Sequence, residues 1–140
     1  MRLIIIAFLF AICSSVYSQN FDSLQWQHRI LVLHAPIEKG NSLEKQIKYF
    51  LQDTAGLNER RLKMYVINKN QLTEISTDTI QNNKFYPIPL KERKMSNSVL
   101  IELFGLDGGL KKTWHTFLER KTLYGIIDAM PMRIREIKGY

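Results

Sequence analysis

"RILVLHAPIEKGN", residues 29–41, decides the fold because its pattern predicts a strand, a polar loop and the start of a helix. The run Ile30–Leu33 is apolar without alternation, which is typical of a strand covered on both faces in a parallel or mixed sheet. Asn41 can cap a helix, and Glu44 follows three positions later as in a capping box. Loops between such elements commonly carry function. The segment from His34 to Gly40 is therefore the first place to look for a site.

The segments that follow predict the other elements of an α/β protein. Apolar spacing from Leu43 onward predicts a helix that Gly56 terminates. Two prolines further on disfavour helix, so residues 71–97 are expected to form a loop with one short helix near residues 90–95. Further strands are predicted at 62–67, 98–104 and 110–114, with a glycine-rich hairpin at 105–109 between the last two.

A last helix is predicted near the end of the chain. Its apolar residues lie at 123–130, with Thr116 as the candidate cap and Pro131 as the residue that ends it. Gly125 inside this helix costs about 1 kcal/mol relative to alanine, which suggests close packing against a neighbour. The order of elements predicts an α/β fold, a thioredoxin-like three-layer sandwich whose mixed central sheet of about four strands is flanked by helices.

The first 18 residues have the composition of a secretory signal peptide. Arg2 is followed by the apolar run Leu3–Cys13 and then by small and polar residues, which is the usual order in such a peptide. This apolar run is shorter than the stretch of about 20 residues that is needed to span a bilayer. We therefore expect cleavage after Ser18, export to the periplasm or cell exterior, and a single domain over residues 19–140.

Cysteine content and charge exclude some classes of function. Cys13 is the only cysteine and would leave with the signal peptide, so the mature chain would have no thiol for dithiol exchange and no thiolate metal ligand. The formal net charge of +7 becomes +6 when Arg2 is removed. This charge favours contact with anionic surfaces. An unknown protein or an anionic envelope component is the expected partner, and nucleic acid is not.

Three stretches are informative when taken together: WQHRILVLHAP (26–36), GLDGGLKKTW (105–114) and IIDAMPMRIRE (127–136). They resemble a small secreted bacterial family of unknown function that is related to the repeated domain of the vertebrate DUDES extracellular-matrix proteins. The resemblance covers nearly the whole mature chain and implies a thioredoxin-like fold. It implies no biochemical activity.

The loop after the first strand differs from that of a catalytic thioredoxin. Where such an enzyme carries Cys-x-x-Cys, this chain has the stretch Pro36–Lys39, which cannot form a mixed disulfide. A scaffold of this kind without its thiols more often binds than catalyses, an argument by analogy. The loop therefore predicts a binding surface made of His34, Pro36, Glu38 and Lys39.

His34 also suggests an alternative, a thiol-free enzyme. A histidine titrates near neutral pH and could act as a general base, with Glu38 or Arg133 in support. The three histidines of the chain are scattered without the spacing of zinc ligands. The sequence therefore predicts no metal site and no cofactor.

The stretch around Met130–Arg133 allows two interpretations. It could be a helix exit at which Arg133 pairs with a carboxylate such as Asp128. It could instead place Arg133 and Arg135 on a surface that recognises an anionic group, because arginine offers paired planar donors. The sequence thus favours an exported, non-catalytic binding module, with the thiol-free enzyme and a basic domain on acidic envelope surfaces as alternatives.

Overall fold

The apolar run found in the sequence forms β1 (Arg29–His34), a central strand with all six residues buried. β2 (Leu62–Asn68) pairs with β1 in parallel, and β4 (Leu100–Phe104) pairs with it on the other side in antiparallel orientation. Burial on both faces explains why β1 lacks apolar alternation. The structure, a computed structural model, describes residues 24–34, 41–68, 71–75 and 99–139.

Two edge strands complete a five-stranded mixed sheet within the described residues, in the order β3-β2-β1-β4-β5. β5 (Leu110–Trp114) returns from β4 through the predicted hairpin, in which Gly108 has a positive φ of 76°. β3 (Gln71–Ile75) was not predicted, since the sequence placed these residues in a loop. Its backbone pairs with β2, and only one of its residues, Leu72, belongs to the buried core, so its apolar pattern is weak. The predicted α/β class and mixed sheet are confirmed.

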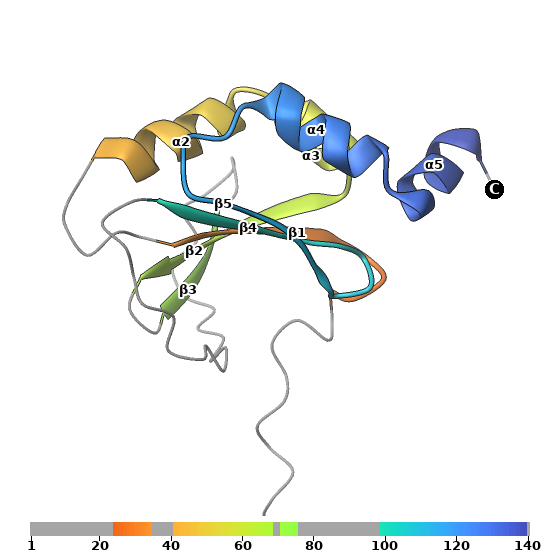
Figure 1. Cartoon of the computed structure of the whole chain (residues 1–140), viewed down its shortest axis with the longest axis horizontal. Helices are drawn as coiled ribbons and strands as arrows, with labels where there is room; N and C mark the ends of the chain where they lie inside the picture. The colour runs from red at the N-terminus through yellow and green to blue at the C-terminus, as the bar shows by residue number, and fades with distance from the viewer. Residues whose placement is uncertain (1–23, 35–40, 69–70, 76–98, 140) are drawn as a thin grey trace, which may run out of the picture.

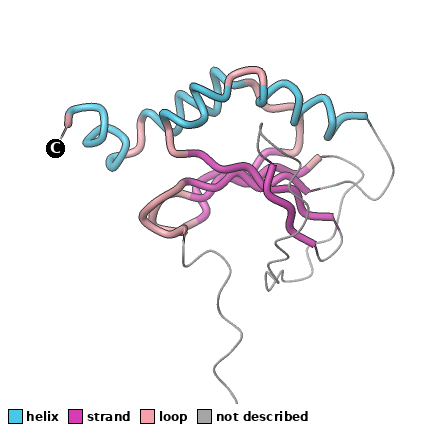
Figure 2. The backbone as a smooth tube through the Cα atoms, turned by 180° about the vertical axis from the view of Figure 1, so that it is seen from behind, coloured by secondary structure: helices cyan, strands magenta, loops and turns pink. Residues whose placement is uncertain are grey.

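The helices of the described residues cover one face of this sheet (Figures 1 and 2). α2 (Asn41–Leu51) and α3 (Thr54–Glu59) connect β1 to β2, and α4 (Arg120–Asp128) follows β5. α5 (Pro131–Lys138) extends beyond the sheet at the C-terminal end of the chain. A thioredoxin-like layout is compatible with this arrangement.

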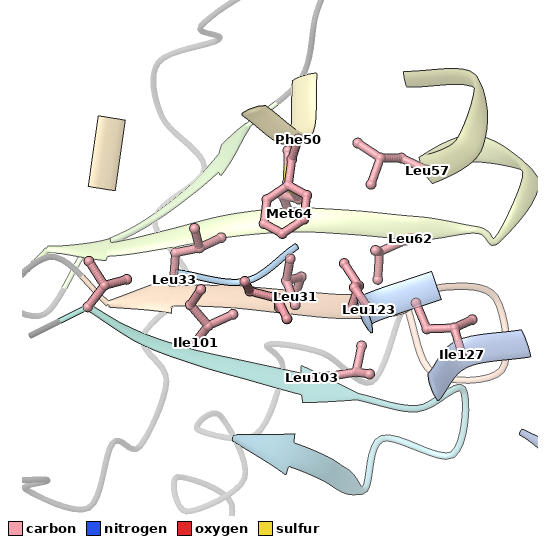
Figure 3. Close-up of a cluster of buried hydrophobic side chains, with 12 residues drawn as sticks. Leu31, Leu33, Phe50, Leu57, Leu62, Met64, Ile101, Leu103, Leu123 and Ile127 are labelled. Atoms are coloured by element: carbon pink, nitrogen blue, oxygen red, sulfur yellow. The ribbon is translucent and has the colours of Figure 1, made fainter. Parts of the chain in front are cut away.

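The main core lies between these helices and the sheet. Leu31 and Leu33 of β1 belong to this cluster together with Phe50 of α2 and with Leu123 and Ile127 of α4 (Figure 3). The opposite face of the sheet has a smaller buried cluster: Ile30, Val32, Tyr65, Ile67 and Leu72. No described helix lies over that second face, so a third layer stays a prediction.

Helix ends differ from the predicted ones where side chains compete to cap them. Gly56 lies inside α3 and ends no helix. The first helix already ends at Leu51, and Asp53 caps the next one by accepting a hydrogen bond from the Gly56 N–H at 3.0 Å. Thr116 is not the cap of α4, which begins at Arg120. The segment before α4 is held by α2 instead, through two hydrogen bonds between the Gln46 amide and the Leu118 backbone at 2.7 and 2.9 Å.

Two predictions about the last helix are wrong. Pro131 follows the end of α4 but also begins α5, where a proline in the first turn loses no hydrogen bond. Gly125 is exposed, and a Cβ built there would meet nothing within 4 Å, so close packing does not explain it.

Other predictions concern segments outside the description. The signal peptide, the loop at 35–40 and the helix near 90–95 lie outside the described residues. Among the helices that are described, none combines the length and the apolar character needed to cross a membrane.

Candidate functional site

A buried pair of polar side chains lies at the end of β1 that leads into the predicted loop. His34 Nε2 is 2.9 Å from Glu102 Oε2, and the two side chains are only 8% and 3% exposed. Val32 is the direct partner of Glu102 in the sheet, so His34 and Glu102 are diagonal neighbours on one face. A charged carboxylate in such a position needs a hydrogen-bonding partner, and His34 supplies one.

The position of this pair matches a common place for ligands. In open α/β sheets, ligands bind outside the carboxyl ends of strands, where neighbouring connections leave in opposite directions. His34 is the last residue of β1, so the pair lies at the carboxyl end of an inner strand that is parallel to β2 and antiparallel to β4. Three predicted site residues, Pro36, Glu38 and Lys39, lie outside the described residues.

Glu102 was not predicted from the sequence. It is the single charge in an otherwise apolar strand, VLIELF (99–104), and it is among the buried polar residues. A lone carboxylate in a central strand is itself a signal, since burial demands a partner for it. The partner could not be identified, because His34 is 68 positions away.

The same face of the sheet has a second polar group beside the apolar cluster. Glu74 accepts a hydrogen bond from the Tyr65 hydroxyl at 3.2 Å and forms an ion pair with Lys63 at 2.9 Å. Burial is the main cause that lowers the pKa of His28 on the neighbouring lead-in to β1. This face therefore combines polar pairs with a buried apolar cluster. No group of three metal-ligating side chains occurs within the described residues.

Arg133 and Arg135, predicted together, have different environments. Arg133 is buried and forms ion pairs with Glu59 at 2.6 Å and with Asp128 at 3.1 Å. It also lies 3.4 Å from Glu136. The pair with Asp128 is the one that the helix-exit interpretation expected. Arg135 is exposed and forms no ion pair with a described residue.

Arg133 belongs to a larger set of charges, which we name the arginine cluster: Arg29, Glu59, Arg60, Asp128, Arg133 and Glu136. Arg29 is fully buried and contacts both oxygens of Glu136 at 3.2 Å, while Arg60 contacts Asp128 at 2.7 Å. Partial burial would raise the pKa of Asp128, but the hydrogen bonds from Arg60 and Arg133 outweigh it and hold that pKa below its usual value. The cluster ties α3, α4 and α5 to the start of β1.

Tyr124 lies beside this cluster on α4. The Arg60 guanidinium is 4.1 Å from the centre of its ring, a cation–π contact. Its hydroxyl donates a hydrogen bond to Asp53 at 3.0 Å. Burial and that hydrogen bond raise the pKa of Tyr124 to about 12.

The His34 pair and the arginine cluster lie at opposite ends of β1. Arg29 is the first residue of the strand and His34 the last. Five steps along a strand cover about 17 Å. Arg133 is linked through Glu136 to Arg29, at the end of β1 opposite to His34. Glu102 is the described carboxylate that lies within hydrogen-bonding distance of the imidazole.

Comparison with known proteins places the chain in a family. No curated protein matches the chain, and no solved structure does. Residues 20–136 match a family described as a domain of unknown function, DUF4174. This match spans every strand and nearly all of the helices described above. The chain therefore belongs to the DUF4174 family of domains of unknown function.

Proposed function

We propose that this protein is an exported, non-catalytic binding module that holds its ligand at the carboxyl end of β1. The observation that carries the proposal is the buried His34–Glu102 pair at 2.9 Å. Because both side chains are nearly inaccessible, the pair is suited to holding the strand end in place for the residues that follow. Pro36, Glu38 and Lys39 then supply the contacts to the ligand.

The family resemblance supports a thioredoxin-like scaffold and a relation to the DUDES repeated domain. The order β2-β1-β4-β5, with α2 and α4 on one face, agrees with that scaffold. Without a cysteine after residue 13, such a scaffold has no dithiol chemistry. By analogy, a scaffold of this kind that lacks its thiols more often serves binding.

Ligand binding is tested by capture with a matched control. The full chain, tagged and produced in its own cells, is cross-linked, and captured material is quantified for the wild type and for E38A/K39A. The control is E44A/K48A, which removes an exposed ion pair of α2 and leaves the net charge equally unchanged. We expect the loop variant alone to lose the captured component, a protein or an anionic envelope molecule. Equal capture by both variants would contradict the proposal.

Export is tested by separating the envelope from the cytoplasm and sequencing the N-terminus of the product. The proposal expects a product that begins at Gln19, after cleavage behind Ser18. A product that retains Met1 and stays in the cytoplasm would contradict export. The result of the capture experiment would not be affected.

One observation favours a second candidate, a thiol-free enzyme. An imidazole within hydrogen-bonding distance of a carboxylate is the arrangement of a general base and its orienting group. Here Glu102 would take the role that the sequence suggested for Glu38 or Arg133. If this candidate is right, the purified protein hydrolyses an ester or amide in a panel of hydrolase substrates. The rate of hydrolysis should then fall about 100-fold in H34Q. Equal rates for H34Q and the wild type would exclude it.

A further inference from the structure

α5 turns two of its charged side chains, Arg133 and Glu136, inward and its apolar side chains outward. Arg133 is the buried residue of this helix, and Glu136 pairs with the buried Arg29. Ile134 and Ile137 are 39% and 60% exposed. Amphipathic helices of globular proteins normally show the reverse arrangement.

This inversion follows from how α5 is attached. The arginine cluster holds it through the ion pairs of Arg133 and Glu136, and none of its apolar side chains is buried. The helix lies at the end of the molecule, beyond the sheet and next to the C-terminus (Figure 1). Its apolar side chains are therefore free to contact a partner without undoing the fold.

The exposed side chains form a continuous surface, which we name the α5 strip: Ile134, Arg135, Ile137 and Lys138. Ile134 and Ile137 are three positions apart and Lys138 is four positions from Ile134, so these three share one side of the helix. Arg135 adjoins them on the outward surface. Both cations are exposed, and neither forms an ion pair with a described residue.

We infer that the α5 strip docks on an anionic phospholipid surface. The two isoleucines enter the boundary between headgroups and acyl chains, while Arg135 and Lys138 contact the phosphates, as in helices that lie in the membrane plane. The helix has eight residues, so it lies on the surface and does not span it. The net charge, +7 for the full chain and +6 without Arg2, adds attraction to the same surface.

Charge complementarity favours this partner over a second copy of the chain. Two α5 strips packed against each other would bring Arg135 and Lys138 of one copy toward the same cations of the other. An anionic lipid surface neutralises them instead. The α5 strip lies beyond the end of the sheet opposite to His34, so this inference is independent of the proposed ligand site.

Vesicle sedimentation tests the inference with the protein purified from its own cells. We expect binding to vesicles of phosphatidylcholine mixed with phosphatidylglycerol, and little binding to phosphatidylcholine alone. I134S/I137S and R135Q/K138Q should each weaken binding about tenfold or more. The control K45Q/K121Q removes two exposed cations from other helices and should keep binding within about twofold, because it leaves the strip intact.

Several results would overturn the inference. If I134S/I137S binds as well as the wild type, the attraction is one of charge alone, without insertion of the isoleucines. Equal losses of binding in R135Q/K138Q and K45Q/K121Q would lead to the same conclusion. Absence of binding to phosphatidylglycerol would exclude lipid as the partner. A photo-reactive group at residue 134 that labels a protein rather than lipid in intact cells would assign the strip to a protein. Unchanged melting temperatures of the variants exclude unfolding as the cause of a loss.

Discussion

Arg133 and Arg135 show that a residue type alone does not decide a role. They are two positions apart on α5, yet one is buried among carboxylates and the other is exposed. A buried charge persists only when it is paired and hydrogen-bonded. The planar guanidinium of Arg133 meets this requirement by contacting Glu59 and Asp128 at the same time.

Replacing each arginine by methionine measures this difference. R133M leaves several carboxylates without their shared cation and should lower the free energy of unfolding by about 3 kcal/mol. R135M removes an exposed charge from the same helix and should change it by less than about 0.5 kcal/mol. Urea denaturation of both variants checks this prediction. Equal losses would mean that Arg133 contributes no more than a surface residue.

At the scale of elements, the boundaries depend on competition between nearby caps. Asp53 caps the start of α3 before Gly56 can end a helix. Ala129 caps the end of α4, and Met130 and Pro131 begin α5 within three residues of Asp128. The backbone conformation at a glycine decides whether the residue is needed there. Gly108 needs a positive φ in its hairpin, whereas Gly125 lies in a regular helix with open space around it.

Opposite effects are therefore expected when these two glycines become alanine. G125A should raise the free energy of unfolding by about 0.5–1 kcal/mol, because alanine favours helix and meets no neighbour. G108A should lower it by about 1 kcal/mol, because alanine resists the left-handed conformation. Thermal unfolding of the two variants tests the signs. A loss of stability in G125A would contradict the open space around this residue.

At the scale of the whole molecule, the arginine cluster joins distant parts of the chain. Arg29 and Glu136 are 107 positions apart, and their bidentate contact links the first strand to the last helix. Asp128 contributes through Arg60 and Arg133. Because the folded-state pKa of Asp128 is lowered, its ionised form stabilises the fold above the ordinary value of about 3.9. That contribution disappears as the pH falls through the lower folded-state pKa.

The unfolding free energy should therefore depend on pH through Asp128. D128N should be about 1–3 kcal/mol less stable than the wild type at neutral pH, and the difference should shrink below about pH 4 as the wild-type carboxylate becomes protonated. Denaturation curves recorded over this range test the effect. The control E119Q, at an exposed residue before α4, should follow the wild type. A difference for D128N that stays constant with pH would contradict the assignment.

Much of the architecture could be read from local patterns. The apolar run of β1, the capping residues of α2 and the hairpin between β4 and β5 each involve neighbours in the chain, and these elements were predicted close to their observed bounds. β3 was missed because its pairing with β2 specifies it more than its own five residues do. α5 was missed because proline reads as the end of one helix as readily as the beginning of another.

The sequence by itself determined the α/β class, the start of the sheet and the lack of any thiol after residue 13, because each depends on composition or on neighbouring residues. The tertiary structure alone decided that Glu102 faces His34, that Arg133 is buried and that the isoleucines of α5 are exposed. The physical reason is that a buried charge is paired with groups distant in the chain. Glu102 lies 68 positions from His34, and Glu136 lies 107 positions from Arg29. No local pattern specifies such a partner.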